Sequence, residues 1–166
     1  MVRKCIKDLL VPILIIACLL GSPPISYGTG GSGLELVIAQ DMEQGGNVLY
    51  RMDIRAGENF RIAYTHSLEK CPIYEVFRVE KNTSVTQIEE VYGWFAAGLE
   101  FNPQTGSAGI GDHGVHIRDM NRNLKEIPIR VGWICNFRLE FKEQVVPLIS
   151  LAPPGKLVWV KVLEKP

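Results

Sequence analysis

Short alternations of apolar and polar residues recur along most of the chain and predict β-strands rather than helices. Turn-forming residues separate these stretches, and we expect strands at residues 34–40, 47–54, 59–67, 73–80, 84–93, 115–120, 135–141, 144–150 and 156–163. Eight or nine short strands with no long helix between them predict an all-β fold, either a single antiparallel β-sandwich or a partly open barrel. Trp133 and Trp159 lie in strand-like or crossing contexts and are expected to fill its core.

Two prolines and one long stretch without strand alternation refine this predicted arrangement of strands. Pro147 removes a backbone donor from its strand, so that strand should lie at a sheet edge or carry a bulge. Pro128 makes residues 125–132 a crossing segment rather than a central strand. Residues 94–114 lack strand alternation and predict a long loop, and loops of this length are often functional.

The N-terminal residues have the order of an export signal, and we assign residues 1–28 to it. A positively charged start is followed by an apolar run at residues 9–20 and then by small residues. An uncleaved anchor helix, or a lipid on Cys18 within a lipobox-like "IIAC", stays open and would give membrane contact through the N-terminus. A linker at residues 29–33 then leads to a β domain at residues 34–166. The protein is therefore expected outside the cytoplasm, whether secreted, periplasmic or anchored to the outer face of the cell membrane.

The charge balance and the cysteine content disfavour several classes of function. Eighteen lysines and arginines balance eighteen aspartates and glutamates, so no basic field favours nucleic acid as a partner. Cys71 and Cys135 are the two cysteines of the exported domain, and they form either one disulfide or two separate thiols. Neither lies in a C-x-x-C pair, which gives no support to a structural zinc site or a redox motif.

The stretch "YTHSLEKCPIYE", residues 64–75, runs from one predicted strand through a turn into the next. If residues 69–72 close the hairpin, apolar residues gather on one face and opposite charges meet on the other. This register pairs Ile62 with Val79, Tyr64 with Phe77 and His66 with Glu75, and on the other face Arg61 with Glu80.

The expected pairing of His66 with Glu75 has two interpretations. It is either a satisfied polar pair at the end of the apolar layer, or part of a pocket for a small ligand or a metal ion. Ser67 is expected on the opposite face because strand side chains alternate, which disfavours a hydrolase with Ser67 as nucleophile and His66 as base.

Metal binding would need further ligands, and the sequence offers two. His113 and His116 would face opposite sides of a strand, so a site containing both is disfavoured. Either one could join His66 and Glu75 in space. The residues do not identify a cofactor.

Three segments of the chain resemble the bacterial domain-of-unknown-function family 1850. "YTHSLEKCPIYEVF" resembles its Y-x-H-S-x-x-x-x-P-x-x-E signature, "YGWFAAGLEF" its following aromatic and glycine-rich segment, and "IPIRVGWICNFRLEF" its later R-V-G segment. The likeness covers about residues 34–163, although Ala96 stands where the family usually has glycine. By position, the signature falls on Tyr64, His66, Ser67, Pro72 and Glu75.

The resemblance implies a small exported or membrane-anchored protein, often encoded beside tripartite ATP-independent periplasmic (TRAP) transporters of the TAXI type, with no established activity. We therefore expect an exported, noncatalytic accessory or binding protein associated with a TRAP-type solute transporter. Two alternatives stay open: a metal-binding protein or metal-dependent enzyme using His66 and Glu75, and a structural envelope protein.

Overall fold

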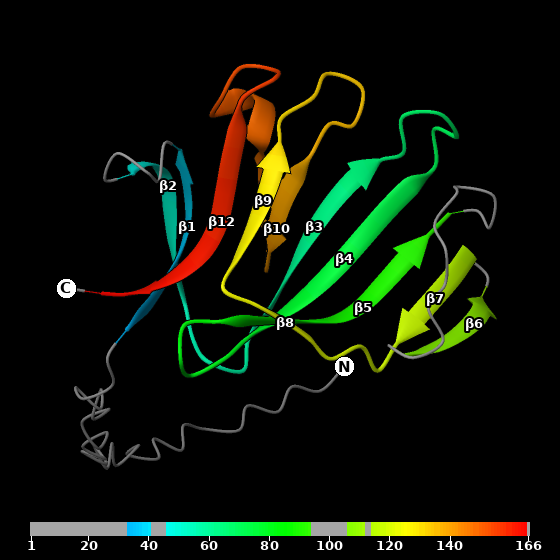
Figure 1. Ribbon diagram of the computed structural model, residues 1–166, viewed down its shortest axis with the longest axis horizontal. Helices are drawn as coiled ribbons and strands as arrows, with labels where there is room; N and C mark the ends of the chain where they lie inside the picture. The colour runs from blue at the N-terminus through cyan, green and yellow to red at the C-terminus, as the bar shows by residue number, and fades with distance from the viewer. Residues whose placement is uncertain (1–32, 41–45, 94–105, 112–113, 166) are drawn as a thin grey trace, which may run out of the picture. The chain divides into compact units, whose positions relative to one another are not determined.

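The computed structural model describes residues 33–40, 46–93, 106–111 and 114–165, and in this part the protein is built from antiparallel β-strands (Figure 1). The strands are β1 (Leu34–Gln40), β2 (Asn47–Ile54), β3 (Asn59–Thr65), β4 (Pro72–Val79), β5 (Val85–Tyr92), β6 (Ser107–Gly111), β7 (Gly114–Arg118), β8 (Arg122–Leu124), β9 (Glu126–Arg130), β10 (Arg138–Phe141), β11 (Gln144–Pro147) and β12 (Leu157–Glu164). A 3₁₀ turn, η2 (Leu148–Ser150), follows β11. Within these ranges no helix is long and apolar enough to cross a membrane.

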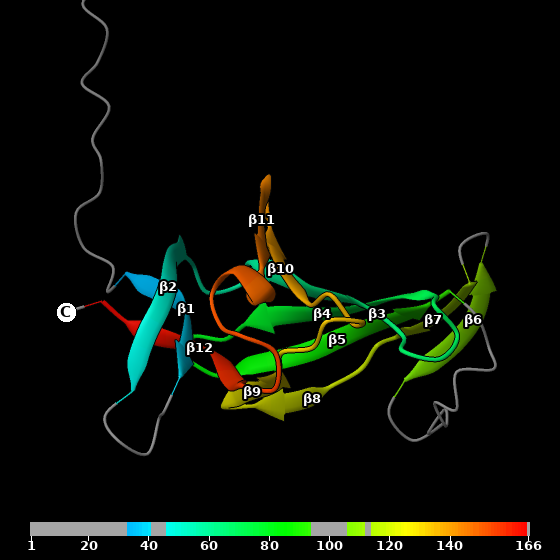
Figure 2. The ribbon, with the colours of Figure 1, turned by 90° about the horizontal axis from the view of Figure 1, so that it is seen from above.

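Two open sheets contain these strands, which confirms the all-β prediction and excludes a closed barrel. The small sheet has the order β2-β1-β12-β9. The large sheet has the order β11-β10-β3-β4-β5-β7-β6, with β8 paired to β5 (Figures 1 and 2). Pro147 lies in β11 at an edge of the large sheet, as its missing backbone donor requires.

The main core lies between the two sheets and combines side chains from both. Leu36, Ile38 and Val160 of the small sheet belong to one buried cluster with Phe60 and Phe77 of the large sheet. The rings of Phe60 and Phe77 stack with their centroids 5.4 Å apart. Such a shared apolar layer defines a sandwich.

A second, smaller apolar cluster lies on the large sheet alone. It contains Ile73 of β4, Tyr92 of β5, and Val115 and Ile117 of β7. Tyr64 of β3 packs against both this cluster and the main core. Tyr64 therefore marks the place on the sheet where the two clusters meet.

Three strands were not expected from the alternation. β6 occupies part of the expected loop at residues 94–114, while residues 94–105 lie outside the described part. β8 is only three residues long and has no alternation to detect. The prediction of a crossing segment around Pro128 is wrong, because these residues form β9; its edge position explains why proline is tolerated there.

The prediction that both tryptophans fill the core is also wrong. The side chain of Trp133 lies in the turn between β9 and β10 and is 76% exposed. Trp159 alternates along β12 with buried Val158 and Val160, so it points away from the core and is half-buried.

Candidate functional site

The β3–β4 hairpin has a different register from the one expected, and this separates His66 from Glu75. Tyr64 pairs with Ile73 and Ile62 with Glu75, so the strands are shifted by four residues relative to the prediction. An even shift leaves each side chain on the expected face but changes its partners. The expected contact between His66 and Glu75 is therefore wrong, and so is that between Arg61 and Glu80, because Arg61 Nε donates to Glu140 Oε2 at 2.8 Å.

The register shifts by four because the turn comprises residues 66–71 and is centred two residues earlier than the expected turn at residues 69–72. Lys70 N donates to His66 O at 3.0 Å, and His66 N donates to Cys71 O at 2.8 Å. Glu69 N donates to the His66 ring at Nδ1, 3.2 Å away. Ser67 also lies in this turn, so strand alternation does not determine its direction. The His66 ring thus accepts a hydrogen bond from the backbone of its own turn rather than contacting Ser67 or Glu75.

Glu75 instead faces a second glutamate. Glu75 of β4 and Glu90 of β5 are direct cross-strand partners on the core-facing side of the large sheet. Their row continues to Ile62 on one side and Ile117 on the other, so two carboxyl groups lie between apolar residues. The Tyr64 hydroxyl donates to Glu75 Oε1 at 3.0 Å. Among the described residues, no lysine, arginine or histidine nitrogen forms an ion pair with either carboxylate.

These surroundings favour the protonated form of both carboxyl groups. Burial raises the pKa of Glu75 above its ordinary value, and the charge of Glu90 raises it further. Burial also raises the pKa of Glu90, while a hydrogen bond from Tyr92 and the charge of Arg122 act in the opposite direction. The pKa values of Tyr64 and Tyr92 are raised mainly by burial, so both hydroxyls stay protonated and able to donate. The arrangement can share a proton or hold a positively charged group.

Sequence reasoning missed Glu90 because of a β-bulge. Val76 pairs with Glu89, whereas Phe77 pairs with Gln87, so β5 carries one extra residue at this point. Uninterrupted alternation from Val85 would place Glu89 on the core side. The bulge reverses this and turns Glu90 inward, and the sequence contains no glycine or proline there to signal it.

The candidate metal ligands are not brought together in the described part of the chain. His66 lies in the turn and Glu75 in β4, while His116 lies in β7 with its Nδ1 3.3 Å from Glu89 Oε1. His113 lies outside the described residues. No group of three or more histidine, cysteine, aspartate or glutamate side chains that could hold a metal ion is found among those described.

Cys71 and Cys135 are both free thiols in the structure. Thr65 N donates to Cys135 O at 2.7 Å and His66 N to Cys71 O at 2.8 Å, so the end of β3 lies between the two cysteines. Two strand spacings amount to roughly 10 Å, whereas bridged cysteines have Cα atoms no more than about 7 Å apart. A disulfide here would require the turns to move.

The β3–β4 turn and the β9–β10 turn both carry exposed apolar side chains. Leu68 of the β3–β4 turn is 81% exposed, and Trp133 and Ile134 of the β9–β10 turn are 76% and 58% exposed. The bond from Thr65 N to Cys135 O joins the end of β3, where the β3–β4 turn begins, to the β9–β10 turn. Figure 1 shows both turns at the same end of the large sheet. We call Leu68, Trp133 and Ile134 the turn patch.

Comparison with models of known protein families shows which family the chain belongs to. The model of the family described as "Domain of unknown function (DUF1850)" matches residues 60–148, which is more than half of the chain. The chain belongs to the DUF1850 family. The match spans β3 to β11 and so includes the glutamate pair and both turns of the turn patch. No curated protein and no solved structure matches this DUF1850 protein significantly.

Proposed function

We propose that this DUF1850 protein is an exported, noncatalytic accessory protein of a TRAP-type solute transporter and that it contacts a protein subunit of that transporter through the turn patch. The observation that carries the proposal is the exposure of Leu68, Trp133 and Ile134 on two turns at the same end of the large sheet (Figure 1), one of which is hydrogen-bonded to the end of β3 from which the other begins. Large apolar side chains gathered on a surface commonly mark an interaction site.

The chemistry of the turn patch favours a protein over a lipid surface. Tryptophan is enriched among the residues that contribute most to protein interfaces. The β3–β4 turn also carries Glu69 beside Lys70, and the whole chain has equal numbers of positive and negative side chains. Binding to anionic membranes usually relies on a cluster of basic residues, so a balanced surface gives little electrostatic attraction to lipid.

The predicted leader and the rigid mounting of the patch support the rest of the proposal. A protein carried out of the cytoplasm by residues 1–28 would meet the extracytoplasmic parts of a transporter. The β3–β4 turn is closed by its own backbone hydrogen bonds, and the β9–β10 turn is hydrogen-bonded to the end of β3, so little conformational freedom is lost on binding. Such preorganisation suits a docking module, and it requires no catalytic group.

Site-specific photo-crosslinking in the source bacterium tests the partner. A photoreactive phenylalanine analogue at position 68 or 133 should crosslink to a TRAP transporter subunit, identified by mass spectrometry of the adduct. The matched control is position 145 on β11, where Val145 is 55% exposed but lies outside the turn patch; it should give no such adduct. Adducts at positions 68 and 133 with lipid alone would refute a protein partner.

Deletion of the gene tests the role in transport. We expect slower uptake of the transported solute at normal transporter levels, and restoration by the wild-type gene. A gene carrying Leu68→Ser and Trp133→Ser together should fail to restore uptake, whereas one carrying Val145→Ser should succeed. Unchanged uptake in the deletion strain would remove the proposed function and leave a structural envelope role.

Replacing the turn patch should weaken the complex itself. Loss of a large side chain at the centre of an interface typically costs about 2 kcal/mol or more, which corresponds to roughly thirtyfold in affinity. The variant with Leu68→Ser and Trp133→Ser should therefore co-purify with the identified subunit at a small fraction of the wild-type yield. Val145→Ser should keep the wild-type yield, and equal yields from both variants would contradict the assignment of the surface.

A further inference from the structure

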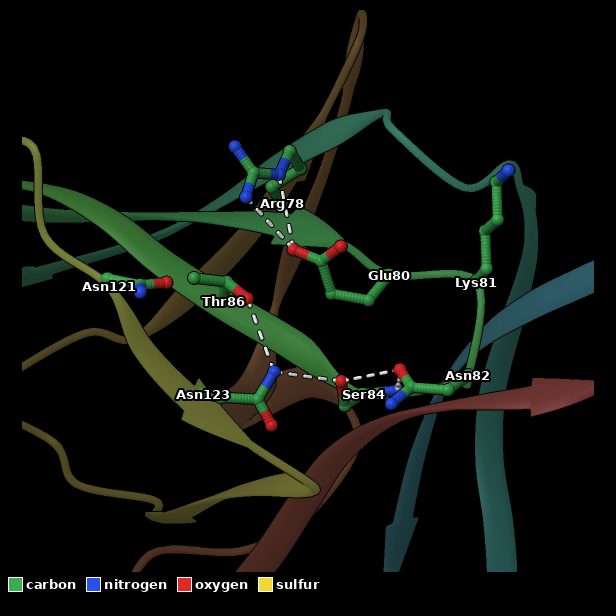
Figure 3. Close-up of a pocket in the computed structure, with 8 residues that line it drawn as sticks. All are labelled: Arg78, Glu80, Lys81, Asn82, Ser84, Thr86, Asn121 and Asn123. Carbon is green, nitrogen blue, oxygen red and sulfur yellow. Dashed lines mark hydrogen bonds and ion pairs between the residues drawn. The ribbon is translucent and has the colours of Figure 1, made fainter.

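A polar hollow lies on the face of the large sheet that points away from the core, at the turn between β4 and β5 (Figure 3). Its volume is about 540 Å³. It is formed by side chains from β4, the following turn, β5 and the segment that carries β8, including Arg78, Lys81, Thr86 and Asn123. It is open to solvent and separate from both the glutamate pair and the turn patch.

The floor of the hollow is a fixed network of hydroxyl and amide groups. Asn123 Nδ2 donates to Ser84 Oγ at 2.9 Å and to Thr86 Oγ1 at 3.3 Å. Ser84 Oγ donates in turn to Asn82 Oδ1 at 2.7 Å. Ser84 and Thr86 are only 6% and 3% exposed. The polar atoms of the floor therefore keep their positions when no ligand is bound.

The charged side chains of the hollow leave one positive charge unmatched. Arg78 donates through Nε and Nη2 to Glu80 Oε1, at 3.2 and 3.1 Å. Hydrogen bonds from Thr86 and Arg78 lower the pKa of Glu80, which keeps this carboxylate ionised. Lys81 has no carboxylate partner among the described residues. The lining thus combines an ion pair with one free ammonium group on a flexible stem.

We propose that this hollow binds a small polyhydroxylated carboxylate. Lys81, the cation that has no carboxylate partner among the described residues, would bind its carboxylate. The side-chain amide of Asn121, which can both donate and accept, would bind its hydroxyl groups, and Asn123 would add only Oδ1 as an acceptor because its Nδ2 hydrogens are used in the floor. None of the side chains that line the hollow in the described part of the chain is aromatic or aliphatic, which disfavours apolar ligands and stacked bases.

This assignment is independent of docking through the turn patch. The hollow and the patch share no residue, so a variant of one leaves the other intact. A failed crosslink at positions 68 and 133 does not bear on the hollow, and a failed titration does not bear on the patch.

Titration of the full-length protein, followed by its backbone amide resonances, tests the proposal with three probes. Glucuronate carries both a carboxylate and ring hydroxyls, glucose carries only the hydroxyls, and acetate carries only the carboxylate. We expect glucuronate to shift resonances of residues 78–86 and 121–123 at millimolar concentration. Glucose and acetate should each bind about tenfold or more weakly, because each lacks one set of hydrogen bonds. Equal resonance shifts with all three probes would overturn the assignment. So would the absence of any shift with glucuronate at about 50 times the millimolar concentration at which binding is expected.

Lys81→Ala provides the matching variant. Lys81 is exposed and lies outside the floor network, so its loss should leave the melting temperature unchanged. Affinity for glucuronate should fall about tenfold, as expected when a hydrogen bond to a charged group is removed. Lys156→Ala, an exposed lysine away from the hollow, should bind like the wild type. A Lys81→Ala protein that binds as tightly as the wild type would exclude the proposed carboxylate site.

Discussion

At the scale of single residues, the most unusual feature is the direct pairing of Glu75 with Glu90. Like charges directly opposite each other destabilise a sheet, and burial adds the cost of removing both carboxylates from water. The raised pKa values reduce this cost by favouring a shared proton. The hydroxyl groups of Tyr64 and Tyr92 donate hydrogen bonds to Glu75 and Glu90, and so stabilise carboxyl groups that have no ion-pair partner in the described part of the chain. The pairing of Glu75 with Glu90 therefore lowers the stability of the folded state.

Glu90→Gln should make the protein more stable at neutral pH. A carboxyl group whose pKa is raised by folding binds its proton more tightly in the folded state, so its contribution to stability falls as pH rises from about 4.3 through the raised value. Above the raised pKa, the ionised carboxylate destabilises the folded state by the full amount. The free energy of unfolding of Glu90→Gln should therefore exceed that of the wild type at pH 8, and the difference should shrink toward pH 4.

Urea unfolding between pH 4 and pH 8 measures this difference. Glu89→Gln is the matched control, because Glu89 is the preceding residue and faces the other side, where its carboxylate lies 3.3 Å from His116 Nδ1 and 3.4 Å from Arg118 Nε. This control should bring no gain at pH 8. A Glu90→Gln protein less stable than the wild type at pH 8 would show that the charged pair is stabilised by something else.

At the scale of the elements, turns and bulges place the functional groups. The six-residue β3–β4 turn sets the register in which Glu75 pairs with Ile62. The bulge in β5 turns the side chain of Glu90 to the same face as Glu75. The β4–β5 turn forms one side of the polar hollow. This turn includes Thr83, whose φ of 64° is in the left-handed region that β-branched residues rarely adopt. The hairpin thus carries local strain beside a candidate binding site.

Thr83→Asn should stabilise the protein by about 0.5–1 kcal/mol, because asparagine tolerates the left-handed conformation better than a β-branched residue. Thr65→Asn is the control. Thr65 lies in extended β3, where threonine is favoured over asparagine, so this change should bring no gain. The midpoints of urea unfolding compare the two variants. An equal effect at both positions would mean that the backbone at Thr83 carries no strain.

At the scale of the whole molecule, apolar side chains serve two different purposes. Phe60, Phe77 and Val160 belong to the buried layer between the sheets and hold the fold together. Leu68 and Trp133 lie on exposed turns and bury little area in this structure. The exposed group contributes little to folding, so its presence is better explained by binding.

Truncation should separate these two groups. Phe77→Ala removes a ring that is 1% exposed and stacked on Phe60, and should lower the free energy of unfolding by about 3–5 kcal/mol. Leu68→Ala should change it by no more than about 0.5 kcal/mol. Thermal or urea unfolding of both variants gives the comparison. A large loss of stability in Leu68→Ala would assign Leu68 to the fold and weaken the docking proposal.

Much of the architecture follows from the amino-acid sequence by itself. Alternation placed β1 and β2 at their observed bounds and the other long strands within a few residues, because burial of one sheet face imposes a period of two. Pro147 marked an edge strand because proline lacks a backbone donor. The same reasoning placed Glu75 on the core-facing side, and the signature residues identified the family before the fold was known.

Only the tertiary structure decided which of these residues meet. The sequence does not distinguish hairpin registers that differ by an even number of residues, since each keeps the same residues on the apolar face. The hydrogen bonds of the His66–Cys71 turn selected one of them and separated His66 from Glu75. The bulge that brings in Glu90, and the hydrogen bond from the end of β3 to the β9–β10 turn, likewise depend on contacts between distant parts of the chain, which local periodicity does not encode.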